Sequence, residues 1–258
     1  MIEKKKVLVI VPFPMSEEHL ANRRAQLKGV KLSPYIEFHF RGVKAGPSSI
    51  ASPADYLYMD MAVFEAGLDA QREGFDAVCI DTTSDSGLEA LRSVLDIPVI
   101  SPGKAAMLSC LMLGNRFGII SQWKFSVERI WKMIRRNGFE PFCAAVVNYD
   151  SPSDVLNLLG GKEEIVFPKM EIACEKAIEA GADVICLGST TMHQAASYLA
   201  KRLPVPIINP GPLTYKIVET VLDLGVTHSR KAYPKSIAPQ DADIHIMFDA
   251  LAGADHRE

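Results

Sequence analysis

Hydroxyl-bearing side chains gather at the ends of two apolar runs, at 75–80 and at 182–187. Runs of this length with β-branched residues are typical of strands buried on both faces of a parallel sheet. The carboxyl ends of such strands are where open α/β sheets bind ligands. Hydroxyls and backbone N–H groups there favour a small carboxylate or a cyclic amide, although they can also simply cap the following helices. The predicted binding residues in these clusters are Thr82, Thr83, Ser84, Ser189, Thr190 and Thr191.

Three side chains near these hydroxyls can transfer protons. Asp81 can activate water, or accept a proton if burial raises its pKa; its alternative role is to accept hydrogen bonds from neighbouring loops. For Asp85, helix capping is the favoured role. His193 belongs to the residue type that titrates near neutral pH, and it can face either the ligand or solvent. A metal site built from these three residues is disfavoured because they lack a recognisable ligand spacing.

Two further residues are candidates for substrate binding. Ser49 lies in the small-residue loop 46–53, which is too long for a simple turn, and long loops are often functional. Lys104 follows the first Pro-Gly turn and can meet a ligand carboxylate, although an exposed lysine is the commoner outcome.

The elements that must position these residues recur along the chain. Each hydroxyl cluster is followed by a helical segment, a short strand and a Pro-Gly turn, at 97–103 and at 205–211. This repetition favours a duplication, although α/β proteins also repeat strand–helix–strand units in general. Strands that alternate with helices predict an α/β fold. We expect two pseudo-symmetric, doubly wound, flavodoxin-like lobes with parallel sheets and the active-site cleft between them.

The expected lobes are residues 1–102 plus 213–258, and residues 103–212, with the chain crossing between them at the two Pro-Gly turns. Within the first lobe, apolar residues at helical spacing predict one long helix over 55–74.

Composition excludes several classes of protein. The chain has 258 residues, 48% of them hydrophobic, and a formal net charge of −3, without the basic excess of a nucleic-acid or membrane binder. The apolar run at 7–11 is too short for a signal peptide or a membrane span. The five cysteines lack metal or CxxC spacing, which favours buried thiols in a reducing cytoplasm. We expect a cytoplasmic protein and, as one option, a homo-oligomer. A nicotinamide oxidoreductase is disfavoured because no GxGxxG follows the first strand.

Three motifs carry a resemblance to a known family. They are Gly46-Pro47-Ser48-Ser49-Ile50 before a helix, Asp85-Ser86-Gly87-Leu88 after the first key strand, and Leu187-Gly188-Ser189-Thr190-Thr191-Met192 after the second. Their order and spacing resemble the Asp/Glu/hydantoin racemase superfamily, in its hydantoin racemase-like branch, from Val7 to about Leu224.

The resemblance implies a cofactor-independent enzyme in which two cysteines, one at each strand end, remove and return the α-proton of a substrate. Thr82 and Ser189 stand at the matching positions, so both catalytic cysteines are missing here. A thiol can be tuned into a thiolate base, whereas a hydroxyl needs an adjacent base. Cys79 and Cys186 lie three residues upstream of these positions, in the apolar strands, and we expect them in the core.

A second departure is Pro12-Phe13-Pro14, which stands where the family has an Asn-containing turn, and it predicts a different ligand shape. Relatives that keep one cysteine are decarboxylases. The sequence therefore predicts isomerase- or lyase-like proton transfer on a small carboxylate or cyclic amide, by catalytic residues Thr82, Ser189, Asp81 and His193, without cofactor or metal. The alternatives are a hydrolase with an Asp- or His-activated water, and a catalytically silent ligand-binding protein.

Overall fold

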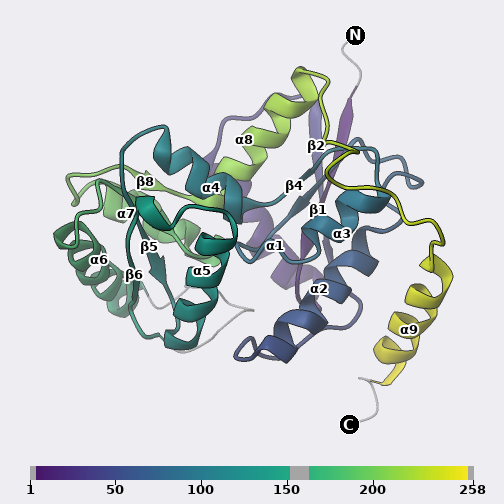
Figure 1. Cartoon of the computed structure of the whole chain (residues 1–258), viewed down its shortest axis with the longest axis horizontal. Helices are drawn as coiled ribbons and strands as arrows, with labels where there is room; N and C mark the ends of the chain where they lie inside the picture. The colour runs from purple at the N-terminus through teal and green to yellow at the C-terminus, as the bar shows by residue number, and fades with distance from the viewer. Residues whose placement is uncertain (1–3, 152–162, 255–258) are drawn as a thin grey trace. The chain divides into compact units, whose positions relative to one another are not determined.

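The computed structural model describes residues 4–151 and 163–254 (Figure 1). The chain divides into two compact units. Unit 1 consists of Met1–Ser101 and Thr214–Glu258, and unit 2 of Pro102–Leu213. The crossings expected from the sequence, after residue 102 and after residue 212, lie one residue away from these boundaries.

Unit 1 contains a sheet of four parallel strands in the order β2-β1-β3-β4. Its register pairs Val7 with Ala77 and Ile10 with Ile80. Because all strands run in the same direction, the residues that follow them meet at one edge, and Asp81–Ser84 lie at that edge. The strands are β1 (Lys5–Val11), β2 (Ile36–Gly42), β3 (Ala77–Ile80) and β4 (Val99–Ile100).

Helices cover both faces of this sheet because β1 and β3 are apolar on both sides. Alternate residues of β1, such as Val9, pack with Leu20 and Tyr215 on one face. Ile10 points to the other face, where it approaches Gly67. The first face carries α1 (Glu17–Arg24) and the part of α8 (Pro210–Asp223) that belongs to unit 1, and the second carries α2 (Pro53–Gly67) and α3 (Leu88–Val94).

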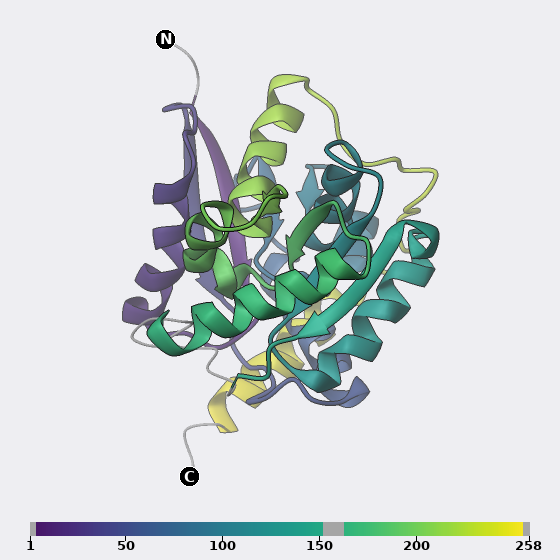
Figure 2. The same cartoon turned by 90° about the vertical axis from the view of Figure 1, so that its left-hand side faces the viewer.

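Unit 2 repeats this plan, with four parallel strands in the order β6-β5-β7-β8. One face packs Phe117 and Ile119 against α4 (Pro102–Leu111) and α5 (Lys124–Arg136). The opposite face packs Ile120 and Ile185 against α6 (Glu163–Glu179) and α7 (Ala196–Ala200). Figure 2 shows α5 in teal and α6 in green on opposite sides of β6. The strands are β5 (Phe117–Ser121), β6 (Cys143–Asn148), β7 (Val184–Leu187) and β8 (Ile207–Ile208).

The α/β class and the two doubly wound lobes are thus confirmed, and their strand orders match position for position. The match extends to single hydrogen bonds. The N–H of Asp81 donates to the carbonyl of Ile10, and the N–H of Gly188 donates to the carbonyl of Ile120, each at 2.8 Å. The two hydroxyl clusters therefore begin at equivalent places in the two units. A cleft between the lobes stays a prediction.

The predicted helix over 55–74 is wrong at its C-terminal end. Helix α2 begins at Pro53, where Ser52 and Asp55 form a capping box, and it ends at Gly67. Beyond that point the chain makes turns, in which the N–H of Leu68 donates to Glu65 and that of Ala70 donates to Gly67. These three-residue bonds replace the helical pattern. Residues 68–74 are mostly polar, and within them only Leu68 and Ala70 continue the apolar spacing, so the prediction overestimated the helix length.

Two expectations concern the burial of the cysteines and the presence of a membrane-spanning segment. All five cysteines are buried and free, as the sequence predicts. Among the residues in the ranges 4–151 and 163–254, none of the helices is both long and apolar enough to cross a membrane.

The glycine that precedes the second hydroxyl cluster gives a test of this fold. A Cβ on Gly188 would lie 2.5 Å from the backbone oxygen of Ile120, which the sheet holds in place. We expect Gly188→Ala to lower the free energy of unfolding by about 1–3 kcal/mol, measured by denaturant titration. Gly29→Ala is the control, because a Cβ there meets nothing within 4 Å. Equal effects of the two changes would contradict the close packing of β7 against β5.

Candidate active site

The hydroxyls that follow β3 are joined to one another. The Oγ1 of Thr82 lies 3.0 Å from the Oγ of Ser84, which lies 2.7 Å from the Oγ of Ser86. Thr82 and Ser84 are half-buried, whereas Ser86 is fully buried. Each hydroxyl can donate once, so the chain of bonds can direct a proton toward its half-buried end. Thr82 is thus placed to donate a hydrogen bond to a ligand.

The carboxylate of Asp85 fixes the turn after these hydroxyls. Asp85 has a φ of 56°, in the left-handed region that aspartate tolerates better than most residues. Its Oδ1 accepts a hydrogen bond of 2.6 Å from the hydroxyl of Ser101, the residue after β4. The N-cap of α3 is Gly87, not Asp85. The expected capping role is therefore wrong, and Asp85 instead links the ends of β3 and β4.

Asp81 lies on the other side of the strand end. Side chains alternate along a strand, so Asp81 continues the face of Cys79, toward α1 and η1 (Ala25–Gly29). Its carboxylate is 3.3 Å from Nη1 of Arg23 and accepts hydrogen bonds of 3.2 and 3.3 Å from Gln26. The side chains of Asp81 and Arg23 are each 1% exposed. Asp81 is thus part of a buried ion pair, and its role as a base stays a prediction.

The charge of Asp81 also acts on its neighbours. Burial, and then the negative charge of Asp81, raise the pKa of the Cys79 thiol. The same two causes raise the pKa of the Tyr215 phenol well above its ordinary value. Both groups are therefore neutral over the physiological range. Cys79 does not provide a thiolate at this strand end, in agreement with its expected place in the core.

In unit 2 the second hydroxyl cluster both caps a helix and remains a cluster. Ser189 is the N-cap of η3 (Thr190–Ala195), and its Oγ accepts a hydrogen bond of 3.2 Å from the N–H of Thr191. The Oγ also lies 2.9 Å from the Oγ1 of Thr191. Thr190 and Thr191 are buried, while Ser189 is half-buried. The capping role is confirmed for Ser189, and its hydroxyl still has one lone pair or proton to offer a ligand.

His193 lies in η3 and is half-buried. Asn209, which follows β8, donates a hydrogen bond of 3.3 Å from Nδ2 to the backbone oxygen of His193. This bond ties the histidine-bearing segment to the end of the neighbouring strand, so the histidine has a fixed backbone position. Cys186, the second upstream cysteine, is buried in the core as expected.

Sequence reasoning missed several polar groups of unit 2. Among the buried atoms without a hydrogen-bond partner in the described part of the chain are Oδ1 of Asn209 and the hydroxyl of Tyr149. Asn209 follows β8 and Tyr149 follows β6. A polar or amphipathic side chain just beyond a buried strand was the signal that could have found them.

Ser49 and Lys104, the two further candidates for substrate binding, are at the surface. Ser49 is exposed in the loop before α2, and Lys104 is exposed in the first turn of α4. The structure brings Thr82 and Ser84 together in unit 1, and Ser189 and Thr191 together in unit 2. Thr83 is buried beside the first cluster. Among the described residues there is no group of three or more His, Cys, Asp or Glu side chains arranged to hold a metal ion.

The chain belongs to the Asp/Glu/hydantoin racemase family, whose sequence pattern matches residues 11–218. Among its relatives, the hydantoin racemase of Rhizobium meliloti is 31% identical over 192 residues, which are 73% of this chain and 79% of that protein. The hydantoin racemase of Pseudomonas sp. (strain NS671) is 29% identical over 72% of this chain and 74% of its own length. The predicted enzyme of the racemase superfamily is thereby confirmed.

Solved structures agree. The allantoin racemase from Klebsiella pneumoniae superposes with a TM-score of 0.82 and 27% identity, over 93% of this chain and 99% of that one. An arylmalonate decarboxylase variant reaches a TM-score of 0.63 at 18% identity, over 89% of this chain and 97% of that one. The second likeness shows the fold alone.

The buried ion pair beneath Thr82 yields a stability test. Replacing one member leaves an uncompensated buried charge, so we expect Arg23→Met to cost about 3–5 kcal/mol in the free energy of unfolding. Adding Asp81→Asn should recover part of that loss, which a double-mutant cycle measures. The control is Arg24→Met on the same helix, whose partner Glu17 is exposed, with an expected loss of about 1 kcal/mol or less. Additive effects at Arg23 and Asp81 would show that the two groups do not interact.

Proposed function

We propose that this enzyme transfers a proton at the acidic C–H of a small cyclic amide or carboxylate, without a cofactor and without the two-cysteine mechanism. The observation that carries the proposal is the pair of hydroxyls, Thr82 and Ser189, at equivalent strand ends of the two sheets. The two clusters are proposed to act on one substrate. The relatives named above are racemases of hydantoin and of allantoin, which supports a cyclic amide as the substrate class.

The hydroxyls themselves are proposed as donors and not as bases. An aliphatic hydroxyl is too weak an acid to provide an alkoxide without an adjacent base. As a fixed donor, however, it stabilises the oxyanion that forms when the substrate loses its proton. Thr82 and Ser189 are suited to this because each is half-buried and held by a second hydroxyl.

His193 is the base that we propose. The imidazole takes the proton, and the electron pair of the broken C–H bond moves onto the neighbouring carbonyl oxygen to give an enolate. Return of a proton to carbon restores the carbonyl and frees the imidazole. Asp81 is a poorer candidate because its carboxylate is already paired with Arg23 in a buried site. Asn209 supports His193 by fixing its backbone.

Exchange in D₂O, followed by NMR, tests the proposal on hydantoins, allantoin, α-amino acids and malonates. We expect the enzyme to exchange the α-proton of a cyclic amide faster than buffer alone does at the same pH. His193→Asn should slow exchange by about 10²- to 10⁴-fold, as for loss of a general base. Ser197→Ala, at an exposed serine of the same unit, should leave the rate unchanged.

The missing thiols can also be put back. If Thr82 and Ser189 occupy the positions of the two family cysteines, the double change Thr82→Cys with Ser189→Cys should add inversion of configuration to exchange. The expected readout is loss of optical rotation of a single enantiomer in the double variant only. Inversion by the unaltered protein would contradict the proposed loss of two-thiol chemistry.

Other outcomes identify the other functions. Incorporation of water into a ring-opened product would indicate a hydrolase. Ligand-induced thermal stabilisation without any exchange would indicate a binding protein and overturn the proposal. Cytoplasmic location and homo-oligomerisation, both expected from the sequence, are kept here as predictions.

A further inference from the structure

Helix α9 (Asp241–Ala254) is held on unit 1 by a buried aromatic side chain and by a cluster of charged contacts. It lies alongside α2, in yellow in Figure 1. Phe248 is its one buried residue within the described range, at 1% exposure, and its ring centroid is 6.3 Å from that of Tyr58. Ile244 and Met247 of α9 are half-buried, whereas Ile246 is exposed. Charged contacts add to this apolar contact between α9 and α2.

The charged contacts converge on a buried carboxylate. The side chain of Glu65 in α2 is 2% exposed, and its Oε1 is 2.8 Å from Nδ1 of His245 in α9. Nε2 of His245 is 3.3 Å from Asp69, just after α2. Lys44 completes the cluster, with Nζ at 2.9 Å from Glu65 and 2.7 Å from Asp249 of α9. His245 thus bridges two carboxylates that belong to the surface on which α9 docks.

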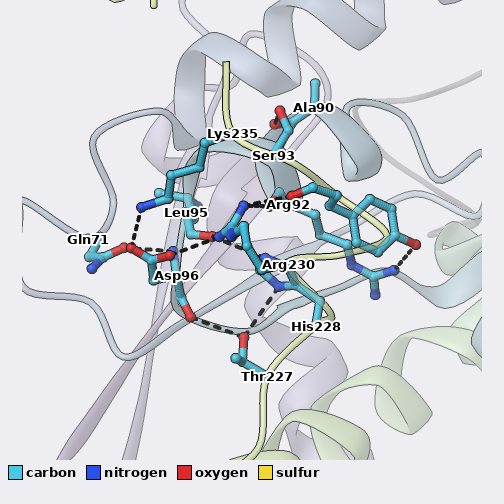
Figure 3. A network of polar contacts seen from close by, with 11 residues as sticks. Gln71, Ala90, Arg92, Ser93, Leu95, Asp96, Thr227, His228, Arg230 and Lys235 are labelled. Carbon is cyan, nitrogen blue, oxygen red and sulfur yellow. Dashed lines mark hydrogen bonds and ion pairs between the residues drawn. The ribbon is translucent and has the colours of Figure 1, made fainter. Parts of the chain in front are cut away.

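Arginine and lysine side chains anchor the segment that leads into α9 (Figure 3). We call residues 227–235 the C-terminal strap. Arg230 in the strap donates to the carbonyls of Arg92 and Leu95 at the C-terminal end of α3, at 2.9 and 2.6 Å. Arg230 and Lys235 also pair with Asp96, at 2.9 and 2.6 Å. Guanidinium and ammonium groups keep their charge near neutral pH, so these contacts persist there.

We propose that His245 makes the docking of α9 on α2 sensitive to pH, with α9 held firmly in mildly acidic solution and loosened as the pH rises. The cationic imidazole satisfies both Glu65 and Asp69. When it loses its proton, it can donate to only one of them. Among the residues that the structure describes, Lys44 is then the one cation paired with the buried carboxylate of Glu65. The proposal is independent of the reaction that the enzyme catalyses.

The groups around His245 set the direction of the effect. The hydrogen bond with Glu65, opposed by burial and helped by Asp69, raises the pKa of His245. Because docking raises this pKa, the cationic imidazole stabilises the docked state at pH values below the ordinary pKa of histidine. This stabilisation is lost as the pH rises through the raised pKa. Hydrogen bonds from Arg72 and His245 outweigh burial and lower the pKa of Asp69.

On α9, the hydrogen bond from Lys44 lowers the pKa of Asp249, and the bonds to Asp249 and Glu65 raise that of Lys44. Because the pKa values of Asp69 and Asp249 are lowered, their ionised carboxylates stabilise docking at pH values above the ordinary carboxyl pKa. That contribution is lost in acid, where the carboxylates are protonated. Two further charged groups belong to this surface: Arg72 donates a hydrogen bond to Asp69, and the negative charge of Asp241 in α9 acts on Arg72. Docking is consequently strongest at pH values between the pKa of these carboxyl groups and the pKa of His245.

Amide hydrogen exchange of α9, corrected for intrinsic rates, measures the docking equilibrium. An isolated helix of this length is marginal in water, so an undocked α9 exchanges rapidly. The ring proton of His245, followed by NMR, gives its pKa in the docked state. Protection of α9 should fall between pH 5.5 and 8.5 by about tenfold for each unit by which docking raises that pKa. Equal protection at both pH values would overturn the proposal.

Two substitutions make the assignment specific. His245→Gln removes the titration and should leave α9 with the same weakened protection at both pH values. His39→Gln is the matched control, because His39 also faces a glutamate, Glu37, but lies on β2 and is 48% exposed. It should keep the pH dependence. Phe248→Ala provides the undocked reference. Persistence of the pH dependence in His245→Gln would assign it to another group and refute the role of His245.

Discussion

A carboxylate buried at the end of β3 has to be balanced by a positive charge, because an isolated charge in a protein interior costs several kcal/mol. Arg23 supplies that charge from α1, and Gln26 adds hydrogen bonds from η1. The pair fixes the end of β3 against these two elements. Since side chains alternate along a strand, holding Asp81 on that side directs Thr82 to the opposite one. The position of the first hydroxyl cluster therefore depends on an ion pair that does not belong to it.

The two units solve the same problem with different residues. At the place where unit 1 has Asp81, unit 2 has Gly188, and both donate the same backbone hydrogen bond to the neighbouring strand. In unit 2 the backbone of Gly188 approaches Ile120 too closely to leave room for a side chain. This strand end therefore carries no buried charge that an ion pair would have to balance. The turn of unit 1 is held by Asp85 in the left-handed region, whereas that of unit 2 is held by Ser189 as an N-cap. The two units thus share the backbone pattern and differ in the side chains that support it.

The structural features that could be predicted from the sequence are those that short segments determine by themselves. The buried strands β3 and β7 follow from their continuous apolar runs, and Ser189 as a helix start follows from its type and place. The burial of Asp81 was not predictable, because Arg23 lies 58 residues away in sequence and only the fold brings them together. The close approach of Gly67, at the end of α2, to Ile10 and Leu91 is again a contact between residues remote in sequence. Asn209 was missed because its environment comes from β8 and η3 together.

The burial of every cysteine has a practical consequence for studying this enzyme. Thiol reagents attack the exposed thiolate, and burial raises the pKa values of Cys143 and Cys174 to about 12. We therefore expect the native cysteines of the folded chain to react slowly with maleimides and with thiol-directed spin labels. A single cysteine introduced at an exposed side chain such as Met112, which is 82% exposed, would become the preferred attachment point without first removing the native ones. The buried native cysteines thus leave the surface of this enzyme available for site-specific labelling.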